Sequence, residues 1–415
     1  MKGPKLMKMA WRNLWRNRRR TILTLVSIAF GTLLAVMFTG FGDHSFSNMI
    51  DLAARMGGGH VTLQHPEYLD RPALTRTVQG TKAKAARALE HPDVSRVTVR
   101  ISGAVMLSTA RESSGAGFMA FDPQAEDQDT LAVFDALTEG EMFKSSRDEG
   151  IILGKKLAEN LNVKLGRKVV YTFTDKQGEI VSGLARVTGI INTGAPSADA
   201  GLCLLPIGTV RDVLGYADDE ATQVALFLVD NRDSREVQEH FRKVFGPETA
   251  VHSWPETQPE LAGFISMKVS GSQLFEIIIM ILVAAGIFNT LFVSVMERLR
   301  EFGILMAIGT SPGHLFRLVM WESLFLGLAG LVSAAILTAW PYYYMNQKGV
   351  DFSAMIGEGG TEIAGVGMES TLYVSIYPEN ALLISVAVLL ATMLAGLYPA
   401  IKAGRVAPVD TIRLV

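Results

Sequence analysis

Cysteine is almost absent from this sequence, because Cys203 is the only one in 415 residues. One thiol excludes an intramolecular disulfide framework and any zinc or iron–sulfur site built from several cysteines. Cys203 stands in the apolar run 202–205, which is typical of a small buried hydrophobe. Charge is also scarce, at 19% of the residues against about 25% in soluble domains. The net charge of −2 gives no basic excess of the kind that nucleic-acid-binding domains carry, so we expect no nucleic-acid partner.

Familiar catalytic and nucleotide-binding motifs are missing as well. The sequence has no G-x-S-x-G elbow, no H-E-x-x-H pair and no EF-hand loop. Its Gly154–Lys155 dipeptide has Glu149 where a phosphate-binding loop needs its first glycine. His60 and His65 flank a strand-like run without a third ligand, and the acidic stretch 122–129 is expected to be a solvated loop. We predict no catalytic residue, no metal site and no cofactor bound by this chain; an enzyme with a dispersed site is a rival hypothesis.

Apolar residues concentrate in four windows that approach the ~20 residues needed to cross a bilayer. The windows predict transmembrane helices at 21–41, 274–296, 315–340 and 381–401. A long segment of ordinary soluble composition, 42–270, separates the first helix from the other three. The first apolar run is longer than a signal-peptide core and has no A-x-A site after it, which favours an uncleaved anchor. The predicted fold class is therefore a four-helix membrane protein with one large domain outside the membrane.

Basic residues flank these helices on what would be a single side of the membrane. They precede the first helix, join the second to the third, and follow the fourth: Lys2, Lys5, Lys8, Arg12, Arg16, Arg18, Arg19, Arg20; Arg298, Arg300, Arg317; Lys402, Arg405, Arg413. By the positive-inside rule that side is the cytoplasm. Both termini, the segment 297–314 and the tail 402–415 are then cytoplasmic, while the domain 42–270 and the loop 341–380 face outward.

The first 20 residues pair an apolar stripe with a basic one at helical spacing. Trp11 and Trp15 belong to the apolar stripe, and lysines and arginines lie opposite. Such a helix suits the headgroup plane, with the tryptophans in the lipid and the bases toward anionic headgroups. We expect segment 1–20 to contact membrane lipid through Trp11, Trp15, Arg18, Arg19 and Arg20; the alternative is a basic tail that only sets orientation.

The outward segment alternates strand-like and helix-like stretches. Residues 168–174 and 179–191 read as a hairpin around the turn Asp175-Lys176-Gln177-Gly178. Residues 81–90 and 234–245 read as helices. This pattern predicts an α+β domain, mostly antiparallel, with an inserted subdomain at about 130–215.

The most informative stretch of the sequence for function is the segment 297–314, which reads E-R-L-R-E-F-G-I-L-M-A-I-G-T-S-P-G-H. It predicts a short helix with charges first, an apolar face of Phe302, Leu305, Met306 and Ile308, and Gly309 at its end. An exposed apolar helix needs a partner's groove. A loop packed under its own bundle is the alternative.

These residues resemble the FtsX-like permease family of ABC transporters, which includes the macrolide-exporter and lipoprotein-releasing permeases. The resemblance covers most of the chain and rests on four stretches: Ala10–Thr21, the Gly150–Gly154 region with Val187–Ile190, the motif E-R-x-R-E-F-G-I-L-x-A-I-G from Glu297, and G-L-Y-P-A-I-K-A-G-R-V-A-P from Gly396. It implies a bacterial inner-membrane protein with a MacB-like periplasmic core domain.

The resemblance also implies a function. Such a permease transmits the ATP-driven motion of a separate ATPase to its periplasmic domain, to extract or export lipoprotein, lipid or amphipathic substrates. Expected partners are two copies of a cytoplasmic ABC ATPase, which holds the ATP and Mg, a second permease copy or paralogue, and a periplasmic adaptor or lipoprotein. The residues implied in coupling to the ATPase are Glu297, Arg298, Arg300, Glu301, Phe302, Gly303, Leu305, Met306 and Gly309. The alternative function is a non-transporting regulator of a periplasmic hydrolase.

Overall fold

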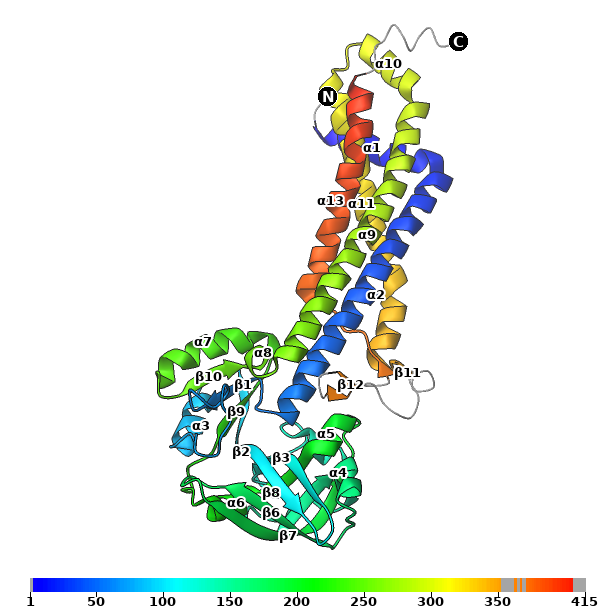
Figure 1. The fold of residues 1–415 in the computed structure, drawn as a ribbon. Helices are drawn as coiled ribbons and strands as arrows, with labels where there is room; N and C mark the ends of the chain where they lie inside the picture. Colours follow the sequence, from blue (N-terminus) through cyan, green and yellow to red (C-terminus); the bar gives the residue numbers. More distant parts are fainter. Residues whose placement is uncertain (1–2, 352–361, 364–365, 368–370, 406–415) are drawn as a thin grey trace. The chain divides into compact units, whose positions relative to one another are not determined.

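The computed structural model describes residues 3–351, 362–363, 366–367 and 371–405, and Figure 1 shows its elements. The chain divides into two compact units. The helical unit consists of residues 1–45, 266–351 and 371–415, and the outer domain of residues 46–265 and 352–370. Most of the tail predicted at 402–415, including Pro408 of the resemblance, lies outside the described residues.

Among the described residues, four helices are long and apolar enough to cross a membrane, which confirms the predicted fold class. The helices that build this part of the chain are α1 (Gly3–Leu14), α2 (Arg18–Met56), α9 (Pro259–Glu297), α10 (Leu299–Ala307), α11 (Pro312–Gln347) and α13 (Pro378–Gly404). All four long helices extend beyond the apolar windows, because helical geometry continues through polar flanking residues. The predicted loop 341–380 accordingly begins inside α11, which continues through Pro341.

The N-terminal segment is two helices rather than the single one expected over 1–20. A short 3-10 turn, Trp15–Asn17, follows α1. The side-chain hydroxyl of Thr21 donates to the carbonyl oxygens of Leu14 and Asn17 and fastens this turn. Arg18, Arg19 and Arg20 therefore form the first turn of α2.

Small residues allow the long helices to approach closely. A Cβ atom on Gly330 of α11 would lie 2.6 Å from the Cγ2 atom of Ile28 in α2, and one on Gly396 of α13 would lie 2.1 Å from the Ser323 hydroxyl oxygen. Gly327, Gly330 and Ala334 are all buried in this way. These three small residues of α11 therefore pack inside this chain.

The segments with basic flanks meet at one end of the helical unit. A buried cluster there combines Leu6 and Ala10 of α1, Phe302 of α10, Leu315 of α11 and Ala403 of α13. Further along α2, the Asp43 carboxylate accepts hydrogen bonds from the Tyr377 backbone N–H (3.1 Å) and the Asn380 amide (2.9 Å) at the start of α13. The N-terminus, the 297–314 segment and the end of α13 thus share one end.

The outer domain is built on a ten-stranded sheet with the order β10-β1-β9-β2-β3-β8-β5-β7-β4, and β6 pairs with β2 and β7. The strands are β1 (Val61–Gln64), β2 (Val94–Ser108), β3 (Ser113–Phe121), β4 (Leu137–Gly140), β5 (Gly150–Gly154), β6 (Lys168–Thr174), β7 (Ile180–Ile191), β8 (Leu202–Pro206), β9 (Gln223–Leu228) and β10 (Ala250–Ser253). The helices are α3 (Thr81–Leu89), α4 (Lys155–Asn160), α5 (Pro196–Gly201), α6 (Ile207–Leu214), α7 (Ser234–Phe245) and α8 (Trp254–Thr257). Short two-residue strands follow α11: β11 (Val350–Asp351) with β14 (Thr371–Leu372), and β12 (Glu362–Ile363) with β13 (Val366–Gly367).

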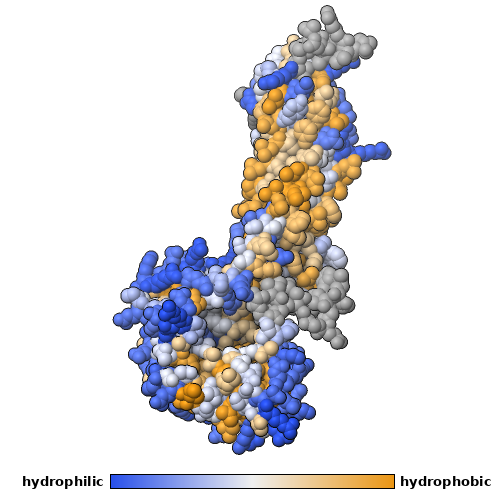
Figure 2. Space-filling model, in the orientation of Figure 1, coloured by the Kyte–Doolittle hydropathy of each residue, from blue (hydrophilic) through white to orange (hydrophobic). Residues whose placement is uncertain are grey.

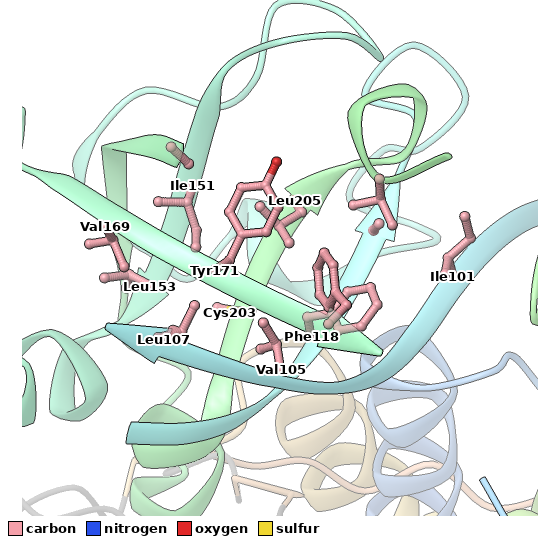
Figure 3. Close-up of a cluster of buried hydrophobic side chains, with 14 of the residues drawn as sticks. Ile101, Val105, Leu107, Phe118, Ile151, Leu153, Val169, Tyr171, Cys203 and Leu205 are labelled. Carbon is pink, nitrogen blue, oxygen red and sulfur yellow. The ribbon is translucent and has the colours of Figure 1, made fainter. Parts of the chain in front are cut away.

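The long strand β2 divides the outer domain into two lobes with separate cores. Its first half joins β1, β9 and β10, where Val61, Leu226 and Val251 pack against α3 and α7. Its second half joins β3, β5, β6, β7 and β8. Figure 3 shows Val105, Phe118, Leu153, Tyr171 and Leu205 pointing toward one another from these strands.

The second lobe agrees with several details expected from the sequence. β6 and β7 pair antiparallel as a hairpin, and Cys203 is fully buried in the core, as predicted. Two parallel pairs, β3 with β8 and β5 with β7, interrupt the otherwise antiparallel sheet. The lobe is wider than the expected insertion at 130–215, since its core takes in residues from Leu74 and Ile101 to Ala221. β2 crosses both lobes, so no boundary falls within it.

Candidate functional site

The segment between α9 and α11 is a separate helix with a defined beginning and end. Arg298 leaves helical geometry (φ −103°, ψ 8°) and precedes α10. Gly309 ends α10 with φ +99°, a backbone conformation that favours glycine. The N–H groups of Gly309 and Thr310 close the end by bonding the carbonyls of Met306 (3.0 Å) and Leu305 (2.9 Å). Pro312 then opens α11 at its first position.

The inner face of α10 belongs to the core of the helical unit. Phe302 is fully buried and belongs to one hydrophobic cluster with residues of α1, α9, α11 and α13: Leu6, Ala10, Val295, Leu315, Leu318, Val319, Ala400 and Ala403. Gly303 is buried beside it. The sequence predicts Phe302 as an anchor that fills a partner's groove, but in the structure Phe302 lies in the core of its own chain. For this residue, the alternative of a loop packed under its own bundle is the one that fits.

The outer face of α10 carries a different set of residues. Among those predicted to couple to an ATPase, Glu297, Arg300, Glu301 and Gly309 are exposed, whereas Leu305 and Met306 are half-buried. The large apolar side chains exposed here are Ile304 (49%) and Ile308 (74%). Residues 300, 304 and 308 follow one another at i+4 spacing and so share one helix face. Ile304 was missed in the sequence; its spacing from Arg300 and Ile308 was the signal that could have found it.

A buried ion pair joins the start of α10 to α11. The Arg298 guanidinium donates to both Glu322 carboxylate oxygens, at 3.0 and 3.1 Å, and both side chains are less than 10% exposed. The Asn13 amide of α1 donates to the same carboxylate at 2.7 Å. The Arg298 guanidinium also lies 4.9 Å from the Phe302 ring centroid. A buried charge pair of this kind is stabilised by hydrogen bonds to both partners, and both Glu322 carboxylate oxygens accept them here.

Two further ion pairs hold the N-terminal region against the same segment. Arg16 lies 3.0 Å from the Glu301 carboxylate, and Arg20 lies 2.5 Å from Glu297. Burial alone would raise the pKa of Glu301, but its contacts with Arg16 and Arg298 outweigh that effect and hold the pKa below its usual value. The turn Trp15–Asn17 is therefore tied to α10 through Arg16, the first turn of α2 is tied to the end of α9 through Arg20, and α1 shares an apolar cluster with α10.

The tryptophans expected at the membrane interface remain on the surface of the helical unit. Trp11 is 45% and Trp15 38% exposed, while Leu6 and Ala10 turn inward. The rings of Trp11 and Trp15 lie 6.0 Å apart, and that of Trp11 lies 5.6 Å from Phe325. Figure 2 shows hydrophobic side chains over the shaft of the helical unit and hydrophilic ones gathered toward the end with α10.

Polar groups in the outer domain that could have suggested chemistry have structural partners. His60 uses both ring nitrogens, Nε2 with Asp51 (2.9 Å) and Nδ1 as acceptor from the Leu228 N–H (3.0 Å). Glu126, expected in a solvated loop, is instead buried and bonds Arg100 at 2.7 and 2.9 Å. Among the described residues, no group of three or more His, Cys, Asp or Glu is arranged to hold a metal ion.

The described residues contain four candidate spans, an α+β domain between the first and second, and a short helix between the second and third. They define a membrane protein with a large domain outside the membrane. Comparison with known families agrees. The MacB-like periplasmic core domain model matches residues 21–244, more than half of the chain, and the model of the FtsX-like permease C-terminal region matches residues 274–408. The chain belongs to the FtsX-like permease family of ABC transporters, and this membership implies an ATPase partner.

Curated relatives align over most of their length. The chain is 23% identical over 428 residues to the lipoprotein-releasing system transmembrane protein LolC of Xylella fastidiosa, covering 95% of this chain and 93% of that one. It is 20% identical over 361 residues to LolE of Haemophilus influenzae, covering 84% of each chain. It is 22% identical over 351 residues to an uncharacterized ABC transporter permease of Methanocaldococcus jannaschii, covering 81% and 83%.

Proposed function

We propose that this permease receives the ATP-driven motion of a separate ABC ATPase through the exposed face of α10 and passes it to its outer domain. The observation that carries the proposal is the pair Ile304 and Ile308, two exposed isoleucines on one face of a helix whose other face is locked into the bundle. Arg300, also exposed on this face, supplies a polar rim. A protruding apolar pair with a charged edge is the form of an interface anchor.

The bracing of α10 supports a mechanical role. Movement imposed on Ile304 and Ile308 would reach α11 through the buried Arg298–Glu322 pair, and α1 through the Asn13 amide that bonds Glu322. It would also reach the turn Trp15–Asn17 through the pair of Arg16 with Glu301. A rigidly fixed helix transmits displacement, whereas a loosely held loop would absorb it. ATP and Mg are held by the ATPase in this proposal, and this chain contributes contacts only.

We place α10 and both termini in the cytoplasm of a bacterium and the outer domain in the periplasm. The positive-inside rule assigns the three basic flanks to the cytoplasm, and the helices that carry or precede them, α1, α10 and α13, meet in one buried cluster of the helical unit. Trp11, Trp15, Arg18, Arg19 and Arg20 would anchor that end in the headgroup region of the inner membrane. The names of the LolC and LolE relatives support a lipoprotein as cargo, within the wider class of lipids and amphipathic substrates.

The functional complex would contain two ATPase copies and two permeases, identical or paralogous. The low burial of α9 is consistent with a second permease packing against it. In its most apolar stretch 11% of the residues are buried, compared with 33 to 44% in the corresponding stretches of the other three long helices. Asn289 is exposed on α9, and an amide in a membrane is stabilised by hydrogen bonding to a neighbouring helix.

The double substitution Ile304→Ser with Ile308→Ser tests the docking surface. Each truncated anchor costs ~2 kcal/mol or more, about 30-fold in affinity, so copurification of the cognate ATPase should be lost at equal permease abundance. Ile180→Ser is the matched control, because Ile180 is an isoleucine 78% exposed on the outer domain. Phe302→Ala should instead destabilise the permease itself, by about 3–5 kcal/mol. Normal ATPase recovery with the double variant would contradict the proposal.

A further inference from the structure

A cavity of about 360 Å³ lies in the outer domain where the chain leaves α2 and approaches α9. Gly57 and Gly58, which follow α2, form one side, and Thr257 and Gln258, which precede α9, form another. The floor comes from β1, β2, β3 and β9. The Gln258 amide donates to the Ala53 carbonyl oxygen at 3.1 Å, so the ends of the two helices are tied together beside the cavity. Its volume falls within the range of small ligand sites.

Inside the cavity, a directed chain of hydrogen bonds ends on an unused acceptor. The Gln64 amide nitrogen donates to the Gln223 side-chain oxygen at 3.3 Å, and the Gln223 nitrogen donates to the Ser102 hydroxyl at 3.0 Å. This order leaves the side-chain oxygen of Gln64, a residue 5% exposed, without a hydrogen-bond partner among the described residues. A buried side-chain oxygen without a hydrogen bond is unfavourable, so an occupant that donates a hydrogen bond to the Gln64 oxygen would be stabilised there.

The walls define the chemistry of that occupant. None of the described residues that line the cavity is charged, and Leu69, Pro72, Phe118, Met119 and Leu202 give it an apolar side. An ionic group would be buried there without a counter-charge, which is strongly unfavourable. An extended polypeptide presents backbone N–H donors and side chains along its length. If its side chains are uncharged, an N–H group can bond the Gln64 side-chain oxygen while the side chains contact the apolar walls.

We propose that this cavity binds a short uncharged stretch of extended polypeptide through the Gln64 side-chain oxygen. The site is separate from α10, and its occupancy does not depend on the docking of an ATPase. Because Gly57 and Gln258 both line it, a bound peptide contacts the junctions of both helices with the outer domain.

The test uses the full chain in lipid nanodiscs and a capped, uncharged pentapeptide of alanine and glycine with a central benzophenone amino acid. Irradiation and mass spectrometry should place the crosslinks on residues of the cavity wall such as Leu69, Pro72 and Met119. Gln64→Leu removes the acceptor and should lower the crosslink yield at least tenfold. Gly117→Val fills the cavity, since a Cβ on Gly117 meets nothing closer than 3.5 Å, and should do the same.

Gly115→Val is the matched control. Gly115 lies two residues away on the same strand, a Cβ there meets nothing within 4 Å, and the residue does not line the cavity. Its crosslink yield should equal that of the unchanged chain. The proposal would be overturned if unrelated surfaces were labelled equally, or if the crosslink yield with Gly117→Val were undiminished. It would also be overturned if a peptide of net charge labelled the cavity equally strongly, or if a neutral sugar competed and the capped peptide did not.

Discussion

Arg298 and Glu322 stand at the start of α10 and in the first half of α11, and each is buried against the other. Burying the two charges costs several kcal/mol, and their mutual attraction together with the hydrogen bond from Asn13 offsets that cost. The pair therefore specifies how α10 sits on the bundle more than it adds to stability. Removal of one partner is therefore expected to destabilise the chain more than the intact pair stabilises it.

Glu322→Gln should destabilise the chain strongly, by about 3–5 kcal/mol, because Arg298 is left buried without an opposite charge. The measurement is denaturation of the purified permease in detergent. Glu297→Gln is the control: this carboxylate pairs with Arg20 but is 55% exposed, and loss of an exposed pair costs about 1 kcal/mol or less. Equal effects of the two substitutions would show that the buried pair carries no special weight.

Glu220 in the outer domain gives a prediction about pH. Burial alone would raise the pKa of Glu220, but hydrogen bonds from Lys176, Thr77 and the Ala217 N–H, with the charge of Lys176, outweigh it and lower the pKa below its usual value. A depressed pKa in the folded state adds stability above the pKa of the unfolded chain, and this stability is lost as pH falls below it. Thermal melts between pH 6 and 3 should therefore show a smaller acid-induced loss for Glu220→Gln than for the unchanged chain.

For single residues, the sequence predicts whether a side chain is apolar or buried better than it predicts which residues surround that side chain. It indicated the burial of Cys203 and the apolar character of Phe302, since both follow from composition and spacing. It could not show that α1 and α13 cover Phe302, or that Glu126 meets Arg100, because those partners are distant in the chain and only packing brings them together.

As an element, α10 is defined by its two ends. The break at Arg298 separates it from α9, and the left-handed conformation of Gly309 turns the chain toward Pro312. Because both ends are defined in this way, the orientation of α10, and with it of Ile304 and Ile308, is fixed relative to α9 and α11. The sequence indicated the end at Gly309, because glycine followed by Ser-Pro is a helix stop and start signal. The change from apolar to charged residues predicts a separate short helix from 297, next to the observed break at Arg298, although no proline or glycine marks that break.

Gly309→Ala should distort this end, because a residue with a side chain is strained at φ +99°; the cost is about 1–3 kcal/mol. Gly313→Ala is the matched control, since Gly313 lies in the first turn of α11 and a Cβ there meets nothing within 4 Å. That substitution should be neutral or stabilising, because alanine is the better helix former. Thermal stability and ATPase recovery at equal abundance are the two readouts. Indistinguishable behaviour of the two variants would contradict the role given to Gly309.

For the whole molecule, the sequence predicted the number of long apolar helices, the α+β domain and the family, because long apolar runs and charge asymmetry are visible without tertiary contacts. It did not predict the helix lengths or the two lobes that share β2, which depend on packing and strand pairing. The convergence of the three basic segments at one end of the helical unit is a tertiary fact that the charge pattern alone could only suggest.

The central claim is that an ATPase covers the exposed face of α10 on the cytoplasmic side. Ile308→Cys tests it directly, because this residue is 74% exposed. Cys203 can remain, since it is fully buried and burial raises the pKa of its thiol. Arg12→Cys, exposed on α1, reports accessibility on the same side.

The measurement is the rate at which a membrane-impermeant maleimide labels Cys at position 308 in inverted membrane vesicles, with and without the co-expressed ATPase. We predict rapid labelling of both engineered cysteines in the absence of the ATPase, and at least tenfold protection of position 308 relative to position 12 in its presence. Labelling of position 308 only from the outside of intact cells, or at an equal rate with and without the ATPase, would contradict the account.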